Sequence, residues 1–204
     1  MIDLIELGKG AKKASVDLRR KDEETINKTL RLVADLLRAN AELLISENKK
    51  DVETAVKNGK NPAFIDRLKL TEKVINGIAD GVKEVADLVS PVGKVVYEYE
   101  NKEQGIKIIK ENVPFGVVGM IYEARPNVTA DAFALSFKTS NAVILKGGSD
   151  AINSNCAIVN IIKRALEENG IDQNACSLIE DTSRETTEKF MKLDKYVDLL
   201  IPKR

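Results

Sequence analysis

The sequence has 204 residues, of which 43% are hydrophobic and 31% are charged, and these values are typical of a soluble globular protein with one large or two small domains. Lysine plus arginine equals aspartate plus glutamate at 32 each, so the charge balance indicates neither a nucleic acid nor an anionic membrane as a partner. No apolar run approaches the roughly 18 residues of a membrane span, and the amino terminus has no signal-peptide pattern.

Histidine is absent from the sequence, which excludes imidazole metal sites and Ser-His or Cys-His catalytic pairs within this chain. The two cysteines, Cys156 and Cys176, fall in different predicted elements and do not make the disulfide framework of a secreted protein. The sequence therefore predicts a reduced, cytoplasmic setting.

The amino-terminal part is predicted to be helical and to act as scaffold. Asp22, followed by two glutamates, is expected to cap a helix that Asn58-Gly59 ends. A second helix is expected from about Thr71 to Ser90-Pro91. The residues expected to face inward on it are Val74, Ile78, Val82, Val85 and Val89.

A β-hairpin is predicted next, with strands at 95–100 and 106–112 and a turn at 101–105. Tyr97, Tyr99 and Ile108 lie along it. Two alternatives remain open: the hairpin protrudes as an arm that pairs with another subunit, or it packs as an edge hairpin on its own domain.

The pattern predicts that the chain is organised around a βαβ unit at 113–150. The segments 117–122 and 142–145 are near-continuous apolar runs, as expected for strands that are covered on both faces. Residues 128–138 between them are long enough for the crossover helix that a parallel pair needs.

Polar and glycine residues follow both of these strands, at the edge of an open α/β sheet where ligands bind. Arg125, Pro126 and Asn127 follow the first strand, and Lys146, Gly147, Gly148 and Ser149 follow the second. The two glycines would let the backbone approach a ligand, and a helix beginning near Ala151 would point free N–H groups at the loop, where a lysine suits a phosphate. Similar loops also occur in α/β proteins that bind nothing there.

The alternation continues to the end of the sequence. A helix is predicted at 151–169, a strand at 176–179, a helix from the capping box Thr182–Glu185 to Leu193, and a strand at 197–201. Four strands linked by three helices predict a doubly wound, Rossmann-like parallel sheet of the α/β class. Only three residues follow the last strand, so it is expected to be either a sheet edge or a point at which the sequence was cut.

Four motifs in order resemble the gamma-glutamyl phosphate reductase family, also called glutamate-5-semialdehyde dehydrogenase, of the aldehyde dehydrogenase superfamily. The motifs are VPFGVVGMIYEARPNVT, NAVILKGGSDAINSN, LIEDTSRE and YVDLLIPKR, and the likeness extends to the amino-terminal NKKDVETA and DRLKLTEKVI. The resemblance implies an aldehyde-dehydrogenase-like fold and a place in proline biosynthesis. It implies NADPH-dependent reduction of L-glutamyl 5-phosphate to L-glutamate 5-semialdehyde, by attack of a cysteine thiolate on the acyl phosphate.

The resemblance also implies roles for individual residues. Asn127 resembles the oxyanion asparagine, with Arg125 and Pro126 in the same turn. Lys146 resembles the lysine that holds the adenosine ribose or its 2′-phosphate in NADP(H), and Gly147, Gly148 and Ser149 would line the same subsite. The residues expected on the adenine side and at the start of the nicotinamide loop are Glu180, Asp181, Thr182, Pro202 and Lys203.

The family's nucleophilic cysteine would belong to a catalytic domain beyond Arg204, and neither Cys156 nor Cys176 matches its motif. The expected organisation is therefore a helical part at 1–92, a hairpin arm at 93–112 and an NADP-binding part at 113–204, truncated before the catalytic domain and inactive alone. The alternative is an inactive paralogue that serves as a structural or partner-binding module. The expected partners are the small-molecule substrate, further copies of the chain through the hairpin, and glutamate 5-kinase.

Overall fold

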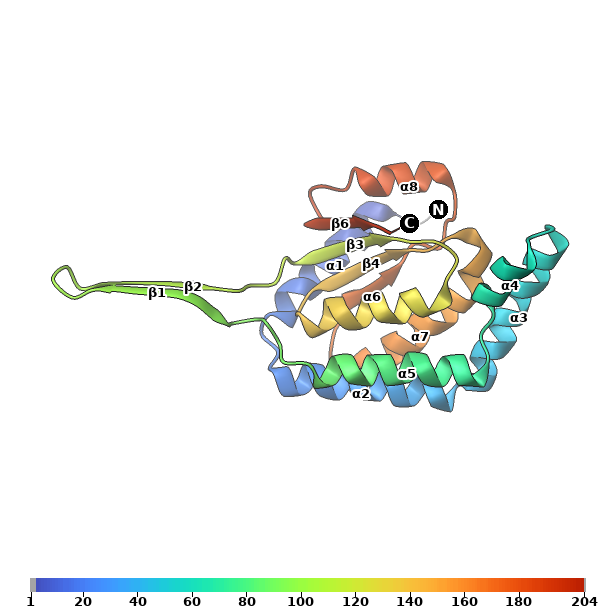
Figure 1. The fold of residues 1–204 in the computed structure, drawn as a ribbon. Helices are drawn as coiled ribbons and strands as arrows, with labels where there is room; N and C mark the ends of the chain where they lie inside the picture. The colour runs from blue at the N-terminus through green and yellow to red at the C-terminus, as the bar shows by residue number, and fades with distance from the viewer. Residues whose placement is uncertain (1–2, 204) are drawn as a thin grey trace.

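The structure, a computed structural model, describes residues 3–203. Its fold is α/β, with a helical amino-terminal part, a two-stranded hairpin and a four-stranded sheet with its helices (Figure 1). The helices are α1 (Leu4–Leu18), α2 (Glu23–Ala39), α3 (Ala41–Lys57), α4 (Pro62–Leu68), α5 (Glu72–Asp87), α6 (Pro126–Lys138), α7 (Ile152–Glu168) and α8 (Arg184–Met191), with 3₁₀ turns η1 (Ser149–Ala151) and η2 (Gln173–Ala175). The strands are β1 (Val95–Asn101), β2 (Ile106–Glu111), β3 (Val117–Ile121), β4 (Ala142–Lys146), β5 (Cys176–Leu178) and β6 (Leu199–Pro202).

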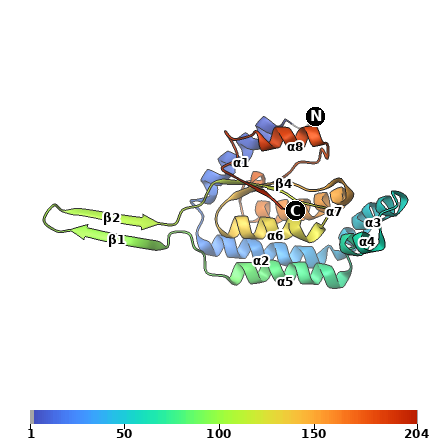
Figure 2. The same ribbon diagram turned by 45° about the horizontal axis from the view of Figure 1, so that its top comes forward.

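The main sheet is fully parallel and has the strand order β5-β4-β3-β6. Helices α6 and α7 cover one face and α1 and α8 the other, while α2 and α5 lie behind α6 and α7 (Figures 1 and 2). The chain moves outward through β3, β4 and β5 and then crosses back by α8 to β6 on the far side of β3. The predicted doubly wound sheet is therefore confirmed.

The sheet is buried because its strands are apolar on both faces. Every residue of β4 is buried, as are the three residues of β5. The rings of Phe133 and Phe137 on α6 stack with their centroids 5.0 Å apart and are fully buried. One hydrophobic cluster joins these residues with α1, α2 and α5, so the amino-terminal helices share a core with the sheet. Within residues 3–203, no helix is long and apolar enough to cross a membrane.

Two details of the amino-terminal helices differ from the sequence prediction. The helix capped by Asp22 ends at Ala39, because the side-chain amide of Asn40 donates to the carbonyl of Leu36 at 2.7 Å and so competes with the backbone for that acceptor. In α5, which follows its N-cap Thr71 where a helix was predicted to begin, Ile75 is buried while Val74 is 39% exposed. Val89 lies beyond the end of that helix and is 91% exposed, so its predicted inward orientation was wrong.

The β1–β2 hairpin projects away from the rest of the molecule as an arm (Figures 1 and 2). All of β2 is exposed and so is β1 up to Glu100, so the alternative of a hairpin packed on its own domain was wrong. Tyr99 pairs with Ile108 and Tyr97 with Lys110; because paired residues share a face of a two-stranded ribbon, these residues make one largely apolar face. Glu98 and Lys107, with an ion pair of 2.7 Å, lie on the other face.

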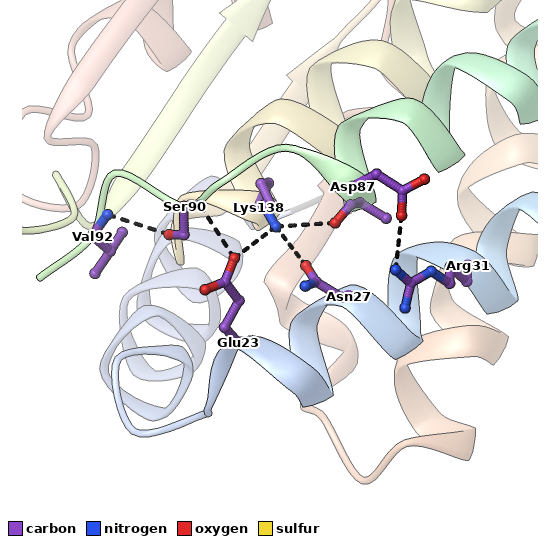
Figure 3. Close-up of polar contacts among 8 residues, drawn as sticks. Glu23, Asn27, Arg31, Asp87, Ser90, Val92 and Lys138 are labelled. Carbon is purple, nitrogen blue, oxygen red and sulfur yellow. Dashed lines mark hydrogen bonds and ion pairs between the residues drawn. The ribbon is translucent and has the colours of Figure 1, made fainter. Parts of the chain in front are cut away.

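A buried lysine ties the root of this arm to three helices (Figure 3). The ammonium of Lys138, at the end of α6, donates to Glu23 Oε1 (3.0 Å) and Asn27 Oδ1 (2.6 Å) on α2 and to the carbonyl of Ala86 (3.1 Å) on α5. Glu23 Oε1 also accepts from the N–H of Ser90 at 3.1 Å. The segment that leads into the arm is thus held against the helical layer.

Candidate functional site

The candidate site lies at the carboxyl edge of the parallel sheet, opposite the end from which β3 starts. Backbone pairing continues past the strands: the N–H of Tyr122 donates to the carbonyl of Lys146 (3.1 Å), that of Ile179 to Leu145 (2.8 Å), and that of Lys203 to Ile121 (2.8 Å). This pairing brings together the loops that follow the four strands, and with them the residues that the sequence singled out.

Lys146 is a deeply buried charged group at this edge, with 4% of its surface exposed. The hydrogen bond that its ammonium makes within the described residues, 3.4 Å to the carbonyl of Gly147, is long. Burial lowers the pKa of Lys146 below its ordinary value, and the nearby carboxylate of Asp181 opposes this shift. A buried ammonium with so little local compensation is chemically suited to an anionic group.

Asp181 is exposed in the loop between β5 and α8. Hydrogen bonds from Thr186 Oγ1 (2.6 Å) and from the N–H of Ser183 (2.8 Å) lower its pKa to about 2, so it is ionised at neutral pH. The predicted capping box is displaced by one residue in the structure. The N-cap of α8 is Ser183, not Thr182, because the turn at Asp181 places the start of the helix one residue later than predicted. Glu180 and Thr182 are exposed beside it.

The two glycines after β4 are closely packed against other parts of this chain. A Cβ on Gly147 would overlap the amide nitrogen of Asn155, and one on Gly148 would come within 3.2 Å of the backbone nitrogen of Ala124. The predicted close approach of the backbone therefore exists, but its partners in the structure are residues of this chain. Ser149 is exposed in the 3₁₀ turn that follows.

A buried polar chain supports this loop from below. Tyr122 Oη and Thr129 Oγ1 are 2.8 Å apart, and Thr129 Oγ1 donates to Asn155 Oδ1 at 2.7 Å. Asn155 is fully buried, and its amide nitrogen has no hydrogen-bond partner among the described residues. Burial raises the pKa of Tyr122 well above its ordinary value, so its hydroxyl stays neutral and serves as a hydrogen-bonding group.

A second group of residues lies at the β3–β6 side of the edge. Asn127 is half-buried in the first turn of α6, which begins at Pro126, and its amide donates to Asp131 Oδ2 at 3.4 Å. Burial raises the pKa of Asp131, while Lys203 and Asn127 oppose the shift. Arg125 precedes the helix and is exposed, as is Pro202 at the end of β6. Asp131 was missed from sequence because only its i+4 spacing from Asn127 marks it.

Two of the N–H groups that were expected to be free at the start of α7 have a partner. Asp51 of α3 accepts from the backbone N–H of Asn153 (3.2 Å) and of Ser154 (2.8 Å). These two donors are therefore not open to a phosphate, contrary to the prediction. Asp51 is 102 residues from Asn153 in the chain, and local sequence carries no signal for such a contact.

Neither cysteine has the environment of a nucleophile. Burial raises the pKa of the half-buried Cys156 to about 11 and that of the fully buried Cys176 to about 12. Both are thiols at neutral pH, whereas nucleophilic cysteines need a lowered pKa. Among residues 3–203, no group of three or more cysteine or carboxylate side chains is arranged to hold a metal ion.

Comparison with known proteins gives consistent matches along the whole chain, although no family model matches it. It is 48% identical over 203 residues to a gamma-glutamyl phosphate reductase of Lachnospira eligens, covering 100% of this chain and 49% of the relative. It is 50% identical over 204 residues to the protein of that name from Agathobacter rectalis, with 100% and 48% covered.

Solved structures agree with the sequence matches. The crystal structure of gamma-glutamyl phosphate reductase from Thermotoga maritima superposes with a TM-score of 0.96 at 35% identity, covering 98% of this chain and 48% of that one. The protein of that name from Saccharomyces cerevisiae gives 0.89 at 32% identity, covering 100% and 51%. A probable aldehyde dehydrogenase from Listeria monocytogenes, at 18% identity and a TM-score of 0.73 with 96% and 40% covered, shows the shared fold alone.

The chain thus spans about half the length of the relatives that it matches. Its sequence and its fold together identify it as a homologue of the gamma-glutamyl phosphate reductases, with the aldehyde dehydrogenase fold.

Proposed function

We propose that this chain is the cofactor-binding part of a gamma-glutamyl phosphate reductase, the NADP-dependent, phosphorylating glutamate-5-semialdehyde dehydrogenase of proline biosynthesis. The whole enzyme would reduce L-glutamyl 5-phosphate to L-glutamate 5-semialdehyde in the cytoplasm. Under this proposal 1–92 is the helical part of the cofactor domain, 93–112 the arm and 113–204 the NADP-binding part. The nucleophilic thiolate comes from outside these 204 residues, because both thiols here are held protonated by burial.

The observation that carries the proposal is Lys146, a buried ammonium at the carboxyl edge of β4 with one long hydrogen bond to its neighbour. Its chemistry fits the phosphate or ribose oxygens of a nicotinamide dinucleotide, and the carboxylate of Asp181 nearby fits ribose hydroxyls. The cofactor, when bound, supplies the hydride. Asn127 would donate its amide to the oxyanion of the substrate, and Asp131 would hold that amide in the free protein.

Nucleotide binding by this chain tests the proposal. Lys146→Ala should weaken NADPH binding by about tenfold or more, because a charge-assisted hydrogen bond is lost; calorimetric titration measures the Kd. Lys28→Ala removes the same charge from an exposed position on α2 and should leave the Kd unchanged. Absence of NADPH binding, or equal Kd values in both variants, would contradict the assignment.

The same titration with NADH separates the two nicotinamide cofactors. Lys146 favours a 2′-phosphate, whereas the negative charge of Asp181 on the same edge opposes one. We propose NADP(H), so NADPH should bind more tightly than NADH, and Asp181→Asn should widen that difference. A preference for NADH in the unchanged protein would contradict this choice.

A second candidate role is assembly through the arm, favoured by its exposure. A two-stranded ribbon is at best marginally stable alone, yet this one carries apolar side chains that are each about half exposed: Val95, Val96, Tyr97, Tyr99, Ile106, Ile108 and Ile109. Both of its edges also offer unpaired backbone groups. We propose that the arm pairs with another copy of the chain; sedimentation of arm variants tests this. Binding of glutamate 5-kinase stays a prediction, which co-sedimentation with the kinase would check.

A further inference from the structure

The amino end of α7 is the place where a doubly wound fold can bind a ligand phosphate, because the first N–H groups of a helix have no partner within it. In this protein the helix cannot cap itself. Its N-cap residue is Ala151, which has no side-chain acceptor. The acceptor comes instead from α3, from a residue that lies 102 positions before Asn153 in the chain.

The acceptor is the carboxylate of Asp51, whose residue is 3% exposed. It receives the backbone N–H of Asn153 (3.2 Å) and of Ser154 (2.8 Å), together with the side-chain amide of Asn153 (2.7 Å) and the hydroxyl of Ser154 (2.6 Å). All four partners donate, so the group acts here as an acceptor-only carboxylate. It presents to the helix end the charge and the oxygens that a bound phosphate would present.

The carboxylate is held in place by its surroundings. The amide of Asn48, one turn earlier on α3, donates to Ser154 Oγ at 3.0 Å and to the carbonyl of Leu68 at 2.8 Å. Asn48 Oδ1 accepts from the N–H of Leu70 at 2.7 Å. Asn48 is also buried. Its hydrogen bonds to the α4 region and to Ser154 therefore hold Asp51 of α3 in place against α7.

We propose that Asp51 is a built-in anion that closes the amino end of α7 to external phosphate, and so determines where an anionic ligand can bind at this sheet edge. The occupied donors leave Lys146 as the buried cation on the β4 side of the edge. The consequence for a nucleotide rests on the proposed function: its phosphate groups take their contacts from Lys146 and the loops after β5 and β6, not from α7. The occupancy of the helix end itself does not depend on that function.

A small carboxylate tests the proposal. In Asp51→Ala the helix end regains two unpaired N–H groups and a space of matching size, so sodium formate should bind there and stabilise the variant. At a formate concentration about five times its Kd, the Tm of Asp51→Ala should rise by about 2–4 °C above that in sodium chloride of equal ionic strength. The Tm of the unchanged protein should be the same in both salts.

Asp87→Ala is the matched control, because it removes one carboxylate from an exposed ion pair with Arg31, away from any helix amino end. It should respond to formate as the unchanged protein does. An equal response of all three proteins would overturn the proposal.

If Asp51→Ala does not fold, Asp51→Asn keeps the shape but offers one acceptor oxygen in place of two. Amide hydrogen exchange should then be at least tenfold faster at either Asn153 or Ser154 than in the unchanged protein, and unchanged exchange at both would overturn the proposal. Neither experiment contains a nucleotide. Loss of NADPH binding would therefore contradict the proposed function while leaving this inference standing.

Discussion

Gly147 shows how a residue can be required by packing at the place where a ligand loop was expected. Its φ is not in the left-handed region, unlike that of Gly59 or Gly170. What it supplies is the absence of a side chain, because Asn155 and the ring of Tyr122 fill the space that a Cβ would take. The glycine thus lets the loop after β4 rest on the polar chain beneath it.

Two glycine substitutions should therefore have opposite effects. Gly147→Ala should lower the free energy of unfolding by about 1–3 kcal/mol, as overpacking of a well-packed interior does. Gly77→Ala, on the exposed face of α5 with nothing within 4 Å of the new Cβ, should raise it by about 0.5–1 kcal/mol. Urea denaturation measures both, and the pair cancels the common effect of Gly→Ala on the unfolded chain. Similar values for the two variants would contradict this account.

At the scale of elements, single carboxylates join segments that are distant in the chain. Asp51 joins α3 to α7, and Asp198, before β6, joins α1 to β3. The ammonium of Lys12 donates to Asp198 Oδ1 at 2.6 Å, and the N–H of Val117 donates to Asp198 Oδ2 at 2.8 Å. These contacts place α1 across the face of the sheet that α6 and α7 leave uncovered (Figure 1).

The tie through Asp198 should depend on pH. Burial raises the pKa of Asp198, but the bonds from Lys12 and Val117 outweigh it, so the pKa lies below its ordinary value of 3.8. A pKa that is lower in the folded state contributes stability that is complete above the unfolded value and is lost as pH falls through the folded one. The difference in Tm between the unchanged protein and Asp198→Asn should therefore be constant from pH 7 to about 5 and shrink below about pH 4. A difference that grows on acidification would contradict this.

At the scale of the whole molecule, the candidate cofactor edge and the arm lie at opposite ends of the sheet. The arm leads into the start of β3 (Figures 1 and 2). Lys146, in contrast, is the last residue of β4, and Asn127 lies in the first turn of α6 after the end of β3. Binding of a cofactor and pairing of copies would therefore use separate surfaces. The helical layer connects them, through Asp51 at one end and the Lys138 cluster at the other.

Arm-mediated assembly should depend on the apolar face of the arm. Ile108→Glu places a charge opposite Tyr99 and should weaken self-association by about tenfold or more, because charged groups are costly in a buried interface. Glu100→Gln changes the opposite face and should have little effect. Sedimentation velocity over a range of concentrations measures both. A monomer at every concentration of the unchanged chain would contradict the proposal.

The sequence alone determined the elements whose causes are local. Asp22 caps a helix, a helix ends at Asn58-Gly59, another begins near Thr71, and continuous apolar runs form the buried parallel strands, each as predicted. These features depend on neighbours a few residues apart, which a pattern can reveal.

Tertiary structure decided the rest, because the decisive contacts join residues far apart in the chain. In the tertiary structure Val74 faces outward and Ile75 faces inward on α5, and the hairpin projects into solvent. The tertiary structure also brings Asp51 to the amino end of α7 across 102 residues, where this carboxylate occupies two N–H groups that were expected to be free. Helical and strand periodicity describes which residues are apolar, but not which distant side chain meets a helix end.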